Sequence, residues 1–531
     1  MIQGATIFQR RIVIGAAICA AAFAMVVFQL VYVTLLRGDD VRAGRARAVA
    51  ARADLVDRTG QLLARDLPVH DLYARPHTFW DKAQAAHDLA VATGAGEGRL
   101  LKGFNGKSPY VLVARQLTPD VQEKVMRLGL PGLEFEQGAK RYYPNGRATA
   151  QLLGVTDPDG NGVSGLEKGL NVSLKEVDEP VATSIDMRVQ YILAAEAAAS
   201  MKMFRAKAAG GVVMDVKSGE VLGLISLPDF DPNQRSLSPA DSQRNIMTQD
   251  VYELGSVFKV FTMTLALEDH TSFPDQIIPV GSGLKIGKYT IREAEKMDAY
   301  LPMREVLAQS SNIGSAQIAM RSGPTRQREF LTTLGLLSPV RTNLPEMAWP
   351  LYPKTNWGTI ETATIGFGHG IGVSPLSYAA AAASVVNGGR KIIPTFVKSP
   401  GDHRGEQVIK PETSAKMREL LRYVVTNGTG RKADIPGYNV GGKTGSAEKP
   451  GKHGYQEKNL VTSFFATFPA EDPRYVVFVM LDEPRGTKET FGFALAGYTA
   501  APMAGRIISR IAPLLGVPNR APPVALAQTG L

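Results

Sequence analysis

The first hydrophobic segment of the chain runs from Ile12 to Leu36 without a charged residue. At 1.5 Å per helical residue it spans roughly 37 Å, enough to cross a bilayer with some tilt. A cleaved signal peptide is the alternative, since Ala20–Ala22 resemble a cleavage site, but the apolar run continues through Val33. The pattern therefore favours an uncleaved membrane anchor within residues 1–37. Four arginines follow the span and two precede it, so the flanking charges do not settle its orientation.

Residues 38–180 contain short alternating segments and no long periodic pattern. The strand Leu55–Val56 entering a turn at Asp57–Gly60, and short helices over 81–93 and 118–128, are the clearest elements. No group of residues there suggests catalysis, which favours a supporting or docking module. The charged, proline-terminated stretch Lys175–Pro180 marks its end.

From residue 181 the pattern changes to strands at both ends with helices between. Helices are predicted after Ser256, over 303–321 and over 375–386, and strands over 212–216, 221–225, 463–468 and 475–481. The first two strands flank Lys217–Glu220 and read as a hairpin. The fold class is therefore α+β, with an antiparallel sheet that pairs remote segments over 181–515 and is flanked by helices. Residues 516–531 are rich in proline and alanine and predict a flexible tail.

Composition narrows the class of protein. The 531 residues leave room for two or three domains, and the formal charge is +10. No long basic block or aromatic-basic interleaving accompanies that charge, so nucleic-acid binding is not inferred; an anionic membrane surface or polymer is an equal candidate. The single cysteine, Cys19, excludes an intramolecular disulfide. The seven histidines are scattered and no His-Glu-x-x-His occurs, so no metal or other cofactor is expected.

Ser256 and Lys259 stand three residues apart at the head of the apolar helix. That spacing is nearly one helical turn, so both side chains face the same way. A desolvated lysine can lose its charge and take the proton of a serine, and a helix N-terminus favours the developing negative charge. Ser-x-x-Lys also occurs by chance, and further copies begin at Ser282 and Ser446. Taken alone, Ser256 is more often a surface or capping serine.

Two further motifs change this picture. Along the chain stand Ser256-x-x-Lys259, Ser310-Ser-Asn312 and Lys443-Thr-Gly-Ser446. The set resembles the superfamily of penicillin-binding transpeptidases and serine β-lactamases, whose signature is Ser-x-x-Lys, Ser-x-Asn and Lys-Thr-Gly. Each motif is weak alone, but three in this order within one domain indicate that superfamily.

The resemblance implies a role for each residue of the first two motifs. Ser256 is expected to attack an amide carbonyl, with neutral Lys259 as the base. Ser310 is expected to pass a proton to the leaving amine. Asn312 is expected to bind both the substrate amide and Lys259. An ordinary mid-helix serine is the alternative for Ser310.

The third motif is expected on an edge strand that binds substrate. Lys443 supplies positive charge for a carboxylate, and Thr444 and Ser446 supply hydroxyls for the same group. Gly445 has no side chain, so that the substrate backbone can lie against the strand. By resemblance, the oxyanion hole is formed by the backbone N–H groups of Ser256 and Ser446. A solvated strand lysine is the alternative for Lys443.

More of the chain, roughly residues 50–510, resembles the class B penicillin-binding proteins. The matching stretches are Arg52…Asp57-Arg58…Gly60, Arg141-Tyr-Tyr-Pro144, Gly162…Gly165…Glu167, Gly211–Asn233 and Ala496–Pro502. Leu254 departs from the usual proline before Gly-Ser, and Ser446 from a threonine; neither removes a needed group.

Membership of that class implies an inner-membrane, single-pass protein with its active domain in the periplasm. It implies a non-catalytic pedestal over 38–180 and a D,D-transpeptidase domain over 181–515 that cross-links peptidoglycan. The substrates would be stem peptides ending in D-Ala-D-Ala, and β-lactams would inhibit. Expected partners are a SEDS-family glycan polymerase (FtsW-like) and other proteins of the division machinery.

Ser310-Ser-Asn-Ile-Gly314 is similar to the division-specific branch of the class, whereas the elongation branch usually has an aspartate in place of Asn312. A septal enzyme is therefore expected, with an elongation enzyme as the alternative. A β-lactamase or D,D-carboxypeptidase is a further rival, but no Glu-x-x-Leu-Asn element follows Ser310 to activate water. A non-catalytic scaffold is disfavoured because no catalytic group is missing.

Overall fold

The computed structural model describes residues 52–355, 357–451 and 454–521, together with residues 14, 17 and 20–28. Among these described residues, no helix has both the length and the apolar character needed to cross a membrane. More than half of the predicted anchor over 12–36 lies outside the described residues, as do residues 522–531 of the predicted tail.

The described chain forms two compact units. The first holds residues 67–140 and 158–160, and the second holds residues 52–66, 141–157 and 161–521. We call them the head unit and the catalytic unit.

The head unit is a small α/β module with its own core. Its elements are β2 (Leu62–Ala74, whose first residues belong to the catalytic unit), η2 (Pro76–Thr78), α3 (Lys82–Thr93), α4 (Glu97–Phe104), β3 (Val111–Leu117), α5 (Pro119–Arg127) and β4 (Leu133–Tyr142, whose last residues return to the catalytic unit). Asp81 caps α3 by accepting from the N–H groups of Ala83 and Gln84, and Gly94 ends it in the left-handed region. The predicted helices over 81–93 and 118–128 are therefore confirmed as α3 and α5.

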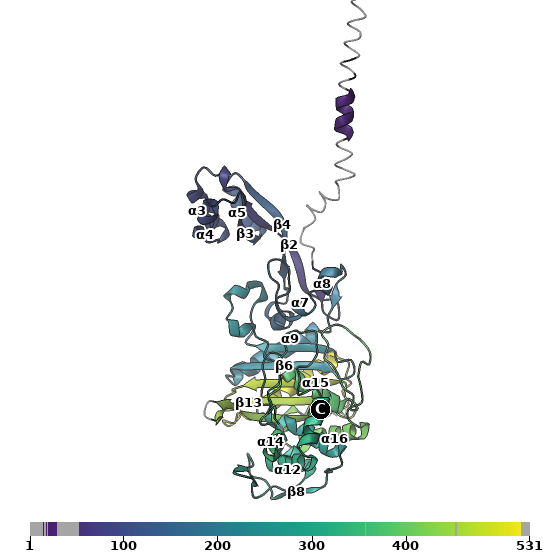
Figure 1. The fold of residues 1–531 in the computed structure, drawn as a ribbon. Coiled ribbons are helices and arrows are strands. Elements are labelled where there is room, and N and C mark those ends of the chain that lie inside the picture. The colour runs from purple at the N-terminus through teal and green to yellow at the C-terminus, as the bar shows by residue number, and fades with distance from the viewer. Residues whose placement is uncertain are drawn as a thin grey trace, which may run out of the picture. The chain divides into compact units, whose positions relative to one another are not determined.

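The catalytic unit contains the remaining elements (Figure 1). They are β1 (Leu55–Val56), η3 (Gly146–Thr149), α6 (Ala150–Leu153), α7 (Gly165–Gly169), α8 (Ser173–Glu176), β5 (Val181–Ala182), α9 (Met187–Met203), β6 (Ala208–Asp215), β7 (Val221–Leu227), η4 (Pro232–Leu237), η5 (Ala240–Gln243), η6 (Gly255–Phe258), α10 (Lys259–Glu268), β8 (Ile277–Pro279), β9 (Leu284–Ile286), β10 (Tyr289–Ile291), β11 (Tyr300–Pro302), α11 (Met303–Ala308), α12 (Asn312–Ser322), α13 (Pro324–Thr333), α14 (Thr359–Ile365), α15 (Pro375–Val386), α16 (Pro411–Asn427), η7 (Arg431–Ala433), β12 (Gly441–Gly451), β13 (Gly454–Phe468), β14 (Tyr475–Asp482) and α17 (Ala500–Leu514).

A five-stranded antiparallel sheet with the order β12-β13-β14-β6-β7 divides this unit into layers. Alternate residues of β14 face opposite cores: Val476 and Phe478 pack with the helices around α10, while Val477 and Val479 pack with α9 and α17. Figure 1 shows α9 on one side of β6 and β13, with α14 and α16 on the other. The predicted hairpin, the remote strand pairing and the helical flanks are confirmed.

A buried ion cluster anchors the segments around the head unit within the catalytic unit. Glu167 binds Arg52 at 2.9 Å and Arg141 at 2.6 Å, and Arg141 also binds Asp66 at 3.2 Å. All four side chains have little or no exposed surface. Removing one partner would leave a buried charge unpaired, so these residues hold the two ends of the head segment close together.

The predicted continuous helix over 303–321 is wrong. The structure has two helices, α11 and α12, which are separated at Gln309–Ser311. Ser310 takes a left-handed φ of 65°, and the Ser311 N–H donates to Val306 O at 2.9 Å. This 6→1 bond defines a Schellman motif in which Ser310 holds the position where glycine is usual. The chain turns there, and Ser310 leaves the helical path.

Candidate active site

Ser256 lies in η6, the tight turn that leads into α10. Gly255 before it has φ +58°, and a Cβ atom on Gly255 would lie 2.9 Å from the carbonyl oxygen of Ser446. Only glycine therefore permits this close approach of η6 to β12. Behind the turn, the buried Tyr378 donates its hydroxyl proton to Val257 O at 2.9 Å. These contacts fix Ser256, partly exposed, beside the edge strand.

Lys259 begins α10 and is completely buried. Its Nζ donates to Asn312 Oδ1 at 2.8 Å and to Ser310 O at 2.5 Å, and it lies 3.2 Å from Ser310 Oγ. Burial lowers its pKa well below the usual lysine value, the charge of Lys443 lowers it further, and the Glu293 carboxylate opposes both. The arrangement thus favours a neutral amine that can accept a proton, as the sequence predicted.

Ser310 is held between two lysines. Lys443 Nζ donates to Ser310 Oγ at 3.0 Å, and Lys259 approaches the same oxygen from α10. The left-handed turn at Ser310 is what aims this hydroxyl at both amines. An ordinary mid-helix serine, the alternative reading, is excluded by that backbone conformation.

Lys443 lies on β12, at the edge of the sheet, as predicted. It has no exposed surface, which excludes a solvated strand lysine. Burial lowers its pKa to about 7. Its Nζ also donates to Thr444 O at 3.0 Å and to Thr444 Oγ1 at 3.3 Å, so the amine lies along the floor of the site.

The other residues of β12 differ in how they meet the site. The Thr444 hydroxyl shares a 2.6 Å hydrogen bond with Thr429, and Ser446 Oγ accepts from the Ala496 N–H at 3.0 Å. A Cβ on Gly445 would lie 2.5 Å from Leu254 O and 2.6 Å from Ser463 Oγ. Glycine is therefore required at position 445 because β12 packs closely against η6 and β13. This differs from the reason expected from the sequence, that the substrate backbone needs room beside the strand.

A cleft of about 610 Å³ opens over these residues. Ser256, Ser310, Asn312, Thr444 and Ser446 all line it. Lys259 and Lys443 lie buried beneath it, and the backbone of Ser446 meets η6, so that all eight predicted residues come together. The two predicted oxyanion donors are on the segments that this contact joins. Within the described residues no group of three or more His, Cys, Asp or Glu side chains is placed to hold a metal.

Sequence reasoning missed two residues of this site. Glu293 lies on the connection between β10 and β11 and binds the start of α12, and Thr429 follows α16 and binds Thr444. Neither lies in one of the three motifs described above. Their partners are set by tertiary structure, so one sequence gives no signal for them.

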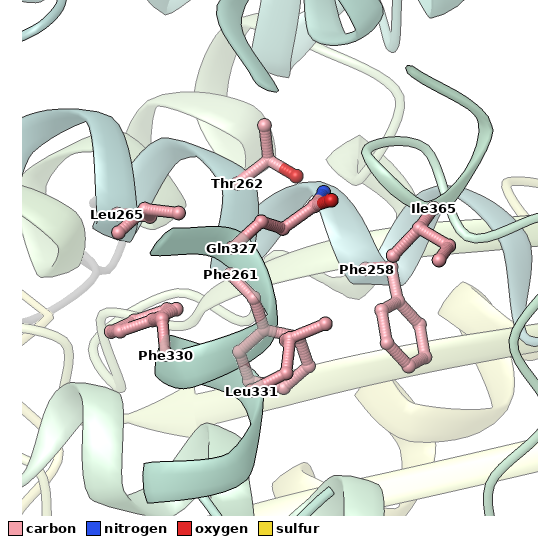
Figure 2. A pocket seen from close by; sticks show the side chains of 8 residues that line it. All are labelled: Phe258, Phe261, Thr262, Leu265, Gln327, Phe330, Leu331 and Ile365. Carbon is pink, nitrogen blue, oxygen red and sulfur yellow. The ribbon is translucent and has the colours of Figure 1, made fainter. Parts of the chain in front are cut away.

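A second, much smaller cavity of about 10 Å³ is lined by residues of η6, α10, α13 and α14 (Figure 2). Its lining residues are Phe258, Phe261, Thr262, Leu265, Gln327, Phe330, Leu331 and Ile365. It has room for at most one water molecule and is a packing gap beside α10.

A serine that precedes by three residues a buried lysine of lowered pKa, and that lies beside an edge strand carrying Lys-Thr-Gly, is typical of the class of serine enzymes that penicillins acylate. The family comparisons agree. Residues 209–508 match the penicillin binding protein transpeptidase domain, and residues 47–176 match the penicillin-binding protein dimerisation domain. The chain belongs to the penicillin-binding protein transpeptidases, in their class B form with both domains.

Individual relatives cover most of the chain. It is 38% identical to the probable peptidoglycan D,D-transpeptidase FtsI of Caulobacter vibrioides, over 92% of this chain and 86% of the relative. It is 30% identical to the stage V sporulation protein D of Bacillus subtilis, over 88% of this chain and 79% of that protein. The crystal structure of penicillin-binding protein 3 from Mycobacterium tuberculosis, complexed with ampicillin, shares the fold at a TM-score of 0.71 and 24% identity, over 90% and 97% of the chains.

Proposed function

We propose that the protein is a septal peptidoglycan D,D-transpeptidase that cross-links stem peptides through an acyl-enzyme on Ser256. The observation that carries the proposal is the buried Lys259, three residues from Ser256 and bonded to both Ser310 and Asn312. Family membership and relatives with D,D-transpeptidase names support the reaction class.

In the first half-reaction, Ser256 Oγ attacks the carbonyl carbon of the D-Ala–D-Ala bond while its proton passes to neutral Lys259. The N–H groups of Ser256 and Ser446 bind the oxyanion. The C–N bond then breaks, and the proton reaches the departing D-Ala amine through Ser310, whose hydroxyl contacts Lys259. The hydroxyls of Thr444 and Ser446 bind the substrate carboxylate, and Lys443 beneath them supplies positive charge. The products are free D-alanine and an acylated serine.

In the second half-reaction, an amine of a neighbouring stem peptide attacks the ester carbon. The amine loses a proton along the same Ser310–Lys259 route, the C–O bond breaks, and Ser256 regains its proton. The net result is one peptide bond broken and one formed, which needs no cofactor. Water in place of the amine would make the enzyme a carboxypeptidase or β-lactamase.

The test of this chemistry is labelling with a fluorescent penicillin, followed by intact-mass analysis and peptide mapping. We expect one slowly hydrolysed adduct per chain, on Ser256, and none in Ser256→Ala. Label on Ser282 or Ser446, or rapid turnover of the penicillin, would contradict the proposal. Product analysis with a donor and an acceptor peptide separates transfer from hydrolysis.

The septal role rests on similarity to proteins named FtsI and on the Ser310–Asn312 motif. Relatives of other names, such as the sporulation protein, leave the elongation alternative open. Depletion in the native cell should block septation while growth in length continues, with a tagged protein at midcell. Rounded cells and a lateral-wall location would assign the protein to elongation instead.

We also propose that the chain is anchored in the inner membrane by residues 12–36, with its catalytic unit in the periplasm. The head unit would then dock a SEDS-family polymerase such as FtsW. Arg141 Nη1 lies 3.2 Å from Asp66 Oδ1, so the two ends of the head segment are close enough for a short glycine linker to replace residues 67–140. The shortened protein should keep penicillin binding and fail to complement. Full complementation would remove the docking role.

A further inference from the structure

Glu293 holds the start of α12 through three hydrogen bonds. Its carboxylate accepts from the Asn312 N–H at 2.7 Å, from the Ile313 N–H at 3.1 Å and from the Ser311 hydroxyl at 2.5 Å. Ser311 Oγ in turn accepts from the Gly314 N–H at 2.9 Å. Glu293 therefore satisfies backbone donors that the helix cannot pair itself, and it orients the capping serine.

The residues held in this way carry catalytic side chains. Asn312, whose N–H binds Glu293, presents Oδ1 to Lys259 at 2.8 Å. Ser310, one residue before the capping Ser311, is in the left-handed region that an L-residue takes only at a cost. Such a turn keeps its shape only if its neighbours fix it. Glu293 reaches across from the β10–β11 connection to do so.

Glu293 also acts on the charge of the site. The charged groups that influence the Lys259 amine are Lys443 from β12, which lowers its pKa, and Glu293, which raises it. His369, on the turn after α14, lines the same cleft and has its own pKa lowered to about 4 by burial and by Lys259, so it is neutral above that pH. Of Lys443, His369 and Glu293, Glu293 is the one that contributes a carboxylate near the Lys259 amine.

We infer that Glu293 is a positioning residue for acylation: it fixes the Ser310–Asn312 turn against Lys259 by hydrogen bonds and offsets the positive charge of the two lysines. The inference rests on the proposed function, because it assigns Glu293 to the acylation of Ser256. It extends the site to the β10–β11 connection, which contains no catalytic motif.

The test measures the second-order rate constant of acylation by a fluorescent penicillin from pH 5 to pH 10 in the full-length protein. Glu293→Gln removes the charge and replaces one acceptor oxygen by a donor. We expect acylation to slow by about tenfold to a hundredfold, as for a misplaced catalytic group. We also expect the acidic limb of the profile to move to lower pH, because loss of a nearby anion favours the neutral lysine.

Two further variants separate positioning from general damage. Glu293→Asp restores the charge with a shorter reach, so it should return the acidic limb to its wild-type position and recover part of the rate. Asp298→Asn makes the same charge change on an exposed residue of the same connection, and should alter neither rate nor limb.

Several outcomes would overturn the inference. An unchanged rate in Glu293→Gln would do so. A purely structural role would give slower acylation in Glu293→Gln with the acidic limb of the pH profile unmoved, and no recovery of the rate in Glu293→Asp. An equal shift of the acidic limb in Asp298→Asn would show that the shift reflects only the overall charge of the protein. If the wild-type protein is not acylated on Ser256, the proposed function fails. If wild type and Glu293→Gln react alike, only this inference fails.

Discussion

Ser310 stands where a Schellman turn normally has glycine. We therefore expect a glycine variant at this position to be more stable than an alanine variant, the reverse of the usual order within a helix. Ser310→Ala and Ser310→Gly both delete the hydroxyl and its contacts with the two lysines. They differ in how well the new residue tolerates φ 65° and in how much conformational freedom it loses on folding. The difference between the two variants therefore separates these backbone effects from the lost hydrogen bonds.

The magnitude follows from two opposing terms. An L-residue in the left-handed region costs roughly 1–2 kcal/mol, which glycine avoids. Glycine loses more conformational freedom on folding, at a cost of about 0.5–1 kcal/mol relative to alanine. The net expectation is that Ser310→Gly is more stable than Ser310→Ala by about 0.75 kcal/mol at the midpoints, within a range of about 0–1.5 kcal/mol. For a unit of about 400 residues this corresponds to roughly 1 °C in melting temperature.

The assay is calorimetric unfolding of both variants, with a matched pair on an exposed helix. Glu329 lies exposed in the interior of α13, so Glu329→Gly should be less stable than Glu329→Ala by about 1 kcal/mol, the usual order. Opposite signs at the two positions are the expected result. If Ser310→Ala were the more stable of its pair, the left-handed turn and its strain would be refuted. Acylation of Ser256 should be lost equally in both Ser310 variants.

Three further predictions concern the buried groups around α10. Lys259→Arg keeps the charge and loses the base, so penicillin labelling kinetics should slow by several orders of magnitude; near-normal labelling would point to another base. Burial lowers the pKa of Lys443 to about 7 in the folded protein, below its value in the unfolded chain. The stability of the wild type relative to Lys443→Met should therefore rise between about pH 7 and pH 10, by at most roughly 1.4 kcal/mol per pH unit. A difference in stability that does not change with pH in calorimetry would refute the lowered pKa. Gln327 Oε1 has no hydrogen-bond partner among the described residues, while its Nε2 donates to Thr362 O at 3.2 Å, an oxygen that also accepts from the Gly366 N–H. The lost bond and the removed unpaired acceptor oppose each other, so Gln327→Leu should change the free energy of unfolding by less than about 1 kcal/mol. A loss of about 2 kcal/mol or more in calorimetry would show that the acceptor is satisfied in solution.

The motif residues could be predicted from sequence because their chemistry depends on residue type and order. A serine, a lysine three residues later and an edge-strand Lys-Thr-Gly need no knowledge of the loops. The turn at Ser310 could not be predicted in the same way, because the apolar spacing of Val306, Leu307 and Ile313 fits one continuous helix. Only tertiary contacts, such as those of Glu293 with the start of α12, break that pattern.

How the segments of the predicted pedestal, residues 38–180, group into compact units could not be predicted from the sequence, for a different reason. Chain order suggests a boundary near residue 180, whereas contacts group residues 52–66 and 141–157 with the catalytic unit. A sequence read in order cannot reveal that a segment returns to a distant partner. The Arg141–Glu167 and Arg52–Glu167 pairs join segments on either side of the head unit, and charged residues in a sequence give no sign that they are buried together.

Lys259 and Lys443 are buried close together, so protonating both amines at once is unfavourable, and this affects how the reaction can proceed. In the proposed mechanism Ser256 gives its proton to Lys259, which places a second ammonium beside Lys443, in surroundings that already lower the pKa of both amines. That state is unfavourable, so the proton should move on quickly, and the Ser310 hydroxyl within reach of both amines provides the route. A substrate carboxylate near Lys443 would offset one positive charge and make Lys259 a better base once the substrate is bound. Binding and activation are then one electrostatic event, since the anion that orients the substrate also stabilises the protonated base.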